Sequence, residues 1–191
     1  MMMLRHAATG VIALAISAAG ISHLQAQSGE ESFTATASVV TAGGATATAP
    51  VTIVVSRKMT GDEAAKLTAV YAREGAGALR KALNGVPPAG SIRIAAGKPS
   101  PIRIALERAT DKGRLLTLIT DQPILHLGAG LPGAKAKEGY DFGVIDIEVD
   151  AAGRGAGTLM PAARIRVDKA VFVIDDYGGQ SIQLTGVQKA K

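Results

Sequence analysis

The chain has 191 residues, no cysteine and no tryptophan, and carries 21 basic and 16 acidic residues. The absence of cysteine excludes disulfides, thiol catalysis and a lipid-anchored lipoprotein. The scattered positive charge, with only three Phe and three Tyr, argues against a nucleic-acid-binding surface, which interleaves clustered Lys and Arg with aromatic side chains.

The first 26 residues have the three parts of a secretory signal peptide: a basic start, an apolar run over residues 7–21, and a short polar end with a cleavage site at Leu24-Gln25-Ala26. The apolar run is shorter than the roughly 20 residues that span a bilayer. We therefore predict that residues 1–26 are removed and that the chain is exported to the periplasm or out of the cell. The mature chain, starting at Gln27, is predicted to have no transmembrane segment and a net charge of +4 (20 basic minus 16 acidic residues).

The next segment, residues 27–56, contains an uncharged stretch from 32 to 56 that is rich in Thr, Ala and Val. Phe33 and every second residue as far as Val39 fall on one face, and Val51, Ile53 and Val55 repeat the alternation after a glycine turn. Alternation of this kind predicts two strands. The sequence leaves open whether they belong to the domain or form an N-terminal extension.

The remaining residues, 57–191, are predicted to form a β-rich domain with helices near 61–84. Thr60 followed three positions later by Glu63 is typical of a capping box at a helix start. Gly75 and Gly77 weaken the middle of the helical pattern, each by about 1 kcal/mol relative to Ala. We therefore expect two short helices, near 61–74 and 76–84.

Short alternating runs follow the helices, from "SIRIAA" at residue 91 to "SIQLTGVQ" at residue 181, and turn-like glycine and aspartate residues separate them. Strands at such short spacing, without intervening helices, pair antiparallel. The predicted fold class is α+β and mostly antiparallel β. It is a sandwich or partly closed barrel with one short helical pair laid against it.

Three of these segments are "GRLLTLITDQPI", "YDFGVIDIEVDAAGRGAG" and "DDYGGQSIQLTGV". They resemble, in the same order, the "RIVLATDRPI" strand, the "FTLIEM-LN-DGEGEG" hairpin and the "ENYGSQPVRLTNV" ending of a family of secreted bacterial proteins of unknown function. The resemblance spans about residues 50–188. It implies a fold rather than an activity, because these motifs form hairpins and include no catalytic signature.

The stretch "DIEVD" places Asp146, Glu148 and Asp150 at every second position of a predicted strand. The pattern is typical of a strand with one face in water. A weak divalent-cation site is the alternative, although calcium requires six to eight converging oxygen ligands. No other cofactor is predicted.

The candidate binding residues are His126, Arg93 and Arg103. His126 is the one histidine left after removal of the leader, which excludes a multi-histidine zinc site. Arg93 and Arg103, together with Arg108 and Arg114, lie on adjacent predicted strands and are candidates for a patch that binds an acidic polymer. Cross-strand pairing with Glu107 or Asp111 is the alternative.

These features favour a non-catalytic secreted or periplasmic module that binds an envelope component or an extracellular polymer. Two alternatives stay open. The first is a small-ligand carrier with an apolar cavity inside a barrel. The second is a hydrolase of envelope polysaccharide, which requires two carboxylates about 5 to 10 Å apart across a cleft.

Overall fold

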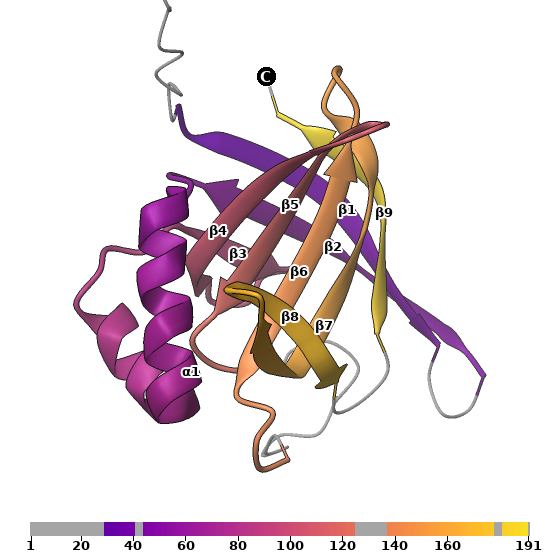
Figure 1. Ribbon diagram of the computed structural model, residues 1–191. Helices are drawn as coiled ribbons and strands as arrows, with labels where there is room; N and C mark the ends of the chain where they lie inside the picture. The colour runs from indigo at the N-terminus through magenta and orange to yellow at the C-terminus, as the bar shows by residue number, and fades with distance from the viewer. Residues whose placement is uncertain (1–28, 41–43, 125–136, 178–180, 191) are drawn as a thin grey trace, which may run out of the picture.

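The computed structural model describes residues 29–40, 44–124, 137–177 and 181–190. These residues form one helix and nine strands (Figure 1). In chain order the elements are β1 (Glu31–Val40), β2 (Thr46–Val55), α1 (Gly61–Asn84), β3 (Gly90–Ile94), β4 (Ser100–Thr110), β5 (Gly113–Thr120), β6 (Phe142–Val149), β7 (Arg154–Asp168), β8 (Val171–Tyr177) and β9 (Ile182–Lys189).

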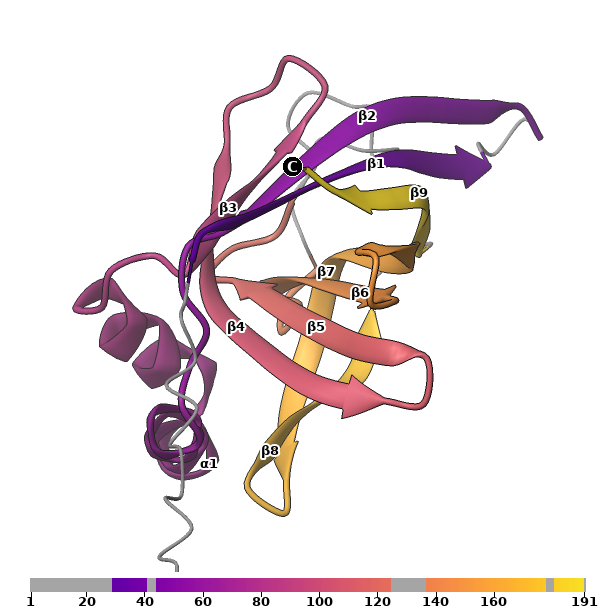
Figure 2. The same cartoon turned by 90° about the horizontal axis from the view of Figure 1, so that it is seen from above.

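Eight of the described strands close into an antiparallel barrel. The strand order is β6-β5-β4-β3-β2-β1-β9-β7-β8, and an additional pairing between β6 and β7 joins the two ends of the ring. The prediction of a mostly antiparallel β fold is confirmed, and of the two predicted architectures the structure is a barrel. The barrel is closed rather than partly closed, and Figure 2 shows the ring from above.

Closure depends on the length of β7. Its first half pairs with β6 on one side and with β9 on the other. Its second half leaves the ring and pairs with β8, from Ala163 to Asp168. One long strand therefore both completes the barrel and forms the hairpin that projects from it.

The uncharged N-terminal segment is part of the barrel. β1 pairs with β2 on one side and with β9 on the other, and β2 pairs with β3. The alternating residues Phe33, Ala37 and Ile53 are almost fully buried, which confirms the predicted alternation. Their side chains belong to the cluster of apolar residues inside the barrel, as expected for an eight-stranded barrel whose interior is filled by side chains.

The helical segment has the predicted break. α1 is interrupted at Gly75, where φ is 78° and ψ is −170°, so it consists of two helical pieces that meet at a kink. The capping box at its start is also confirmed: the Glu63 backbone N–H donates to Thr60 Oγ1 over 3.2 Å, and the Thr60 N–H donates to Glu63 Oε2 over 2.9 Å.

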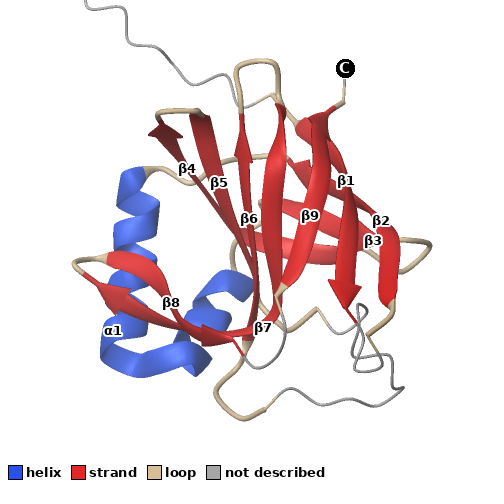
Figure 3. Ribbon diagram, turned by 90° about the vertical axis from the view of Figure 1, so that its right-hand side faces the viewer, coloured by secondary structure: helices blue, strands red, loops and turns tan. Residues whose placement is uncertain are grey.

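A second apolar core lies between α1 and the outer surface of the barrel. It joins Leu79 and Leu83 of the helix to Phe142 and Val144 of β6 and to Phe172 of β8. The ring of Tyr71 packs edge to face on that of Phe172, with centroids 6.1 Å apart. Figure 3 shows β8 beside the helix, away from the ring.

Within the part of the chain that the structure describes, α1 does not combine the length and apolar character of a membrane-spanning helix.

Candidate binding pocket at the barrel mouth

Charged side chains occupy inward-facing positions at one end of the barrel. Glu31 lies on the same face of β1 as the buried Phe33, and Arg114 lies on the same face of β5 as the buried Leu116. Glu107 pairs directly with Leu116, and Lys189 of β9 pairs directly with Phe33. Because alternate residues of a strand point to the same side, these side chains meet where the interior opens to solvent, which we call the mouth.

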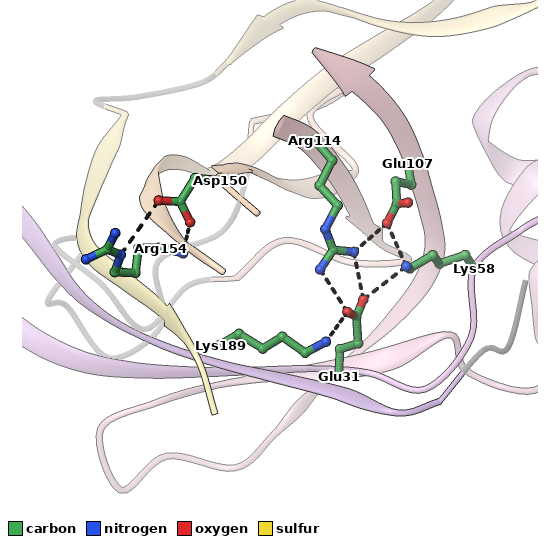
Figure 4. A network of polar contacts seen from close by, with 7 residues as sticks. All are labelled: Glu31, Lys58, Glu107, Arg114, Asp150, Arg154 and Lys189. Atoms are coloured by element: carbon green, nitrogen blue, oxygen red, sulfur yellow. Dashed lines mark hydrogen bonds and ion pairs between the residues drawn. The ribbon is translucent and has the colours of Figure 1, made fainter. Parts of the chain in front are cut away.

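The mouth contains a cluster of five charged residues, shown in Figure 4: Glu31, Lys58, Glu107, Arg114 and Lys189. Arg114 donates to both oxygens of Glu31, over 2.8 and 3.0 Å. Lys189 donates to Glu31 Oε1 over 2.6 Å, and Lys58 lies 3.0 Å from Oε2. Glu107 binds the other side of the cluster, with its Oε2 2.6 Å from both Arg114 Nη1 and Lys58 Nζ.

Glu31 is the buried centre of this cluster, since its side chain is only 11% exposed. Hydrogen bonds from Arg114 lower its pKa far below the usual range, against the opposing effect of burial. The same contacts raise the pKa of Arg114. At Glu107 burial alone would raise the pKa, but the hydrogen bonds from Lys58 and Arg114 outweigh it and the net shift is downward. Both carboxylates and the Arg114 guanidinium are therefore ionised at neutral pH.

The cluster has one more positive charge than negative charge, because three cations surround two carboxylates. The guanidinium of Arg114 also lies 6.0 Å from the ring centroid of Phe33. It therefore forms the boundary between the ionic mouth and the apolar interior.

A pocket of about 360 Å³ opens beside the cluster. It is lined by Gly113 and Arg114 of β5, by Lys189 of β9, and by residues 150–153 of the turn between β6 and β7. Two of the lining positions require glycine. A Cβ on Gly113, where φ is 143°, would lie 2.2 Å from the Val149 carbonyl oxygen, and one on Gly153, where φ is 75°, would lie 2.6 Å from Lys189 Cβ.

Asp150 shapes the pocket wall. Its Oδ1 accepts hydrogen bonds from the backbone N–H groups of Ala152 and Arg154, over 2.8 and 2.9 Å. The bond from Arg154 is the main cause of its lowered pKa. Arg154 Nε lies 3.6 Å from Oδ2. The carboxylate thus fixes the turn and is balanced by a neighbouring cation.

The structure does not gather the three acids proposed as metal ligands into one site. Asp146 accepts a 2.6 Å hydrogen bond from Thr117, and burial raises its pKa. Asp150 is engaged in the turn. Among the described residues there is no group of three or more His, Cys, Asp or Glu side chains arranged to hold a metal ion, and the cation site at Asp146, Glu148 and Asp150 stays a hypothesis.

The proposed binding residues are separated from the mouth pocket. Arg103 pairs with Asp121 over 2.8 Å in a contact where both side chains are less than 20% exposed. Arg93 is exposed on β3. His126 lies outside the described residues. The predicted cross-strand pairing is confirmed at Arg114 and Glu107.

Sequence reasoning missed Glu31, Lys58 and Lys189. Glu31 could have been noticed, because a carboxylate on the buried face of an apolar strand requires hydrogen-bonding or charged partners. Lys189 has no local signal: it reaches Glu31 across 158 positions of the chain. Lys58 lies in the connection between β2 and α1, where periodicity carries no information.

No family model, curated protein or solved structure matches the chain. The resemblance to a family of secreted bacterial proteins therefore stays a prediction.

Proposed function

We propose that the protein is an exported, non-catalytic binding module that holds an anionic group of an envelope component or extracellular polymer in its mouth pocket. The observation that carries the proposal is the excess positive charge of the ionic cluster, two of whose cations, Arg114 and Lys189, line a pocket of about 360 Å³. Pockets of this size are at the lower end of those that bind small molecules or single polymer units.

The protonation of the two carboxylates supports a binding role rather than hydrolysis. A glycosidase keeps one of its two carboxyl groups protonated so that it can donate a proton to the leaving group. The pKa values of Glu31 and Glu107 are both lowered by bonded cations. Neither group holds a proton at neutral pH, so the mouth is suited to electrostatic recognition.

The test is thermal unfolding in the presence of polymers that differ in charge: polygalacturonate, dextran sulfate and neutral dextran. Binding of ligand at 100 times its Kd adds about 2.7 kcal/mol to the free energy of unfolding, which corresponds to a rise of several degrees in Tm. We expect at least one polyanion to raise Tm at low ionic strength, added salt to reduce the rise, and dextran to have no effect.

The matched variants are Lys189→Gln, in the pocket, and Lys98→Gln, which removes the same charge from the exposed connection between β3 and β4. We expect the rise in Tm to be lost in Lys189→Gln and retained in Lys98→Gln. An equal loss of the rise in Tm in both variants would show that the polyanion is attracted by the overall charge of the protein and not by the pocket. A Tm unaffected by either polyanion would contradict the proposal.

A further inference from the structure

The mouth pocket also has features that select among anions. We propose that its ligand carries a single carboxylate on a small body, as a sugar acid or a short organic acid does. This inference rests on the proposed function and specifies the chemistry of the group that the pocket binds.

The charge of the pocket matches a monoanion. The five-residue cluster has a net charge of +1, and Asp150 on the facing wall is balanced by Arg154, so the pair adds nothing to the total. One carboxylate neutralises this excess. A phosphate, with a charge of about −1.5 to −2 at neutral pH, would leave net negative charge beside Glu31 and Glu107.

Lys189 and Arg114 each have N–H groups that are not used within the cluster. The ammonium of Lys189 has three N–H groups, and within the described part of the chain its one hydrogen-bond partner is Glu31, while its side chain is 41% exposed. The guanidinium of Arg114 has five N–H groups, of which three are used by Glu31 and Glu107. A planar carboxylate can accept bonds from both residues at once.

The backbone of the pocket is poorly suited to phosphate. Phosphate sites commonly use free backbone N–H groups, either in a glycine-rich turn or at a helix start. Here the N–H groups of Ala152 and Arg154 donate to the Asp150 side chain, and that of Gly153 donates to the Asp150 carbonyl. The turn already encloses a carboxylate of its own, and three of its N–H groups are occupied in doing so.

The walls restrict the size of the ligand. Apart from Arg114, Lys189 and Asp150, the lining consists of two alanines and two glycines. Larger side chains at the glycines would collide with the backbone or with Lys189. The volume of about 360 Å³ suits one hexose unit or a short acid.

In the experiment, each probe is titrated into the full chain. Binding is measured by isothermal titration calorimetry and by changes in the backbone amide NMR signals of Gly113 and Gly153. The probes share a hexose body and differ in charge: D-glucuronate, D-glucose 6-phosphate and D-glucose. Propionate tests whether the carboxylate alone suffices, which distinguishes a short organic acid from a sugar acid.

We expect glucuronate to bind at least tenfold more tightly than glucose 6-phosphate, with no measurable binding of glucose. Lys189→Gln should weaken glucuronate binding at least tenfold, Lys189→Arg should retain it, and Lys98→Gln should have no effect. Tighter binding of glucose 6-phosphate at the same amides would overturn this inference and leave the proposed anion-binding function standing. Failure of every anion to move the two amide signals would overturn both.

Discussion

Glu31 is a carboxylate at a strand position where alternation otherwise places apolar side chains. It is tolerated there because three cations bond its two oxygens. A buried charge without such partners costs several kcal/mol. Because hydrogen bonds from Arg114 lower the pKa of Glu31 in the folded state, its ionised form stabilises the fold, and this contribution depends on pH.

We predict that Glu31→Gln lowers the free energy of unfolding at pH 7 by about 2 to 3 kcal/mol, because it removes the negative charge and replaces one of the two acceptor oxygens with an NH₂ group that faces the cations. A group whose pKa is lowered on folding contributes fully above its unfolded pKa, about 4.3 for Glu, and less as pH falls below it. The difference between wild type and variant should therefore narrow below about pH 4. Urea denaturation at several pH values measures it.

Glu30→Gln is the control, because Glu30 is the preceding residue and is exposed. It should change the free energy of unfolding by less than about 0.5 kcal/mol at pH 7. A gap between wild type and Glu31→Gln that stays constant down to pH 3 would show that the carboxylate acts through its shape rather than its charge.

At the scale of elements, closure of the barrel depends on glycines at the start of β7. A Cβ on Gly155 would lie 1.8 Å from the Glu148 carbonyl oxygen, and one on Gly157 would lie 2.3 Å from that of Asp146. β6 and β7 can therefore approach this closely only without side chains at these positions. The "GRGAG" segment is part of the strand contact as well as of the turn.

We predict that Gly155→Ala lowers the free energy of unfolding by about 2 kcal/mol, because the added methyl group forces the two strands apart. The control is Gly77→Ala in α1, where an added Cβ meets nothing within 4 Å and the replacement should stabilise the helix by about 0.5 to 1 kcal/mol. The measurement is the urea denaturation midpoint of the wild type and of the two variants under the same conditions. Equal effects of the two substitutions would contradict the role given to Gly155.

The elements that could be predicted from sequence are those with local causes. The capping box at Thr60, the break at Gly75 and the alternation of β1 and β2 each depend on residues within a few positions of one another. Closure of the ring and the ionic mouth depend on pairs separated by up to 158 positions, which no local pattern encodes. Of the candidate site, the sequence therefore singled out Arg114, Glu107 and Asp150 but not Glu31, Lys58 or Lys189, while the strands that build the site were predicted.

At the scale of the whole molecule, the predicted export has a direct test. We expect the chain, expressed with its leader in a bacterial host that exports proteins, to be recovered outside the cytoplasm with Gln27 as its first residue. Mass spectrometry of the purified protein measures the mass and the N-terminal peptide. Recovery of a cytoplasmic chain that keeps residues 1–26 would contradict export and leave the pocket proposal unaffected.

The position of β9 has a consequence for how the barrel assembles. β9 is the last of the described strands, yet it lies between β1, the first of them, and β7. The hydroxyl of Thr185 reaches the carbonyl of Thr36 across 149 positions. Contacts at such separation form slowly, because the intervening chain must first be ordered. Without β9, β1 and β7 would each have an unpaired edge, so a chain shortened before Ile182 is expected to aggregate through these edges.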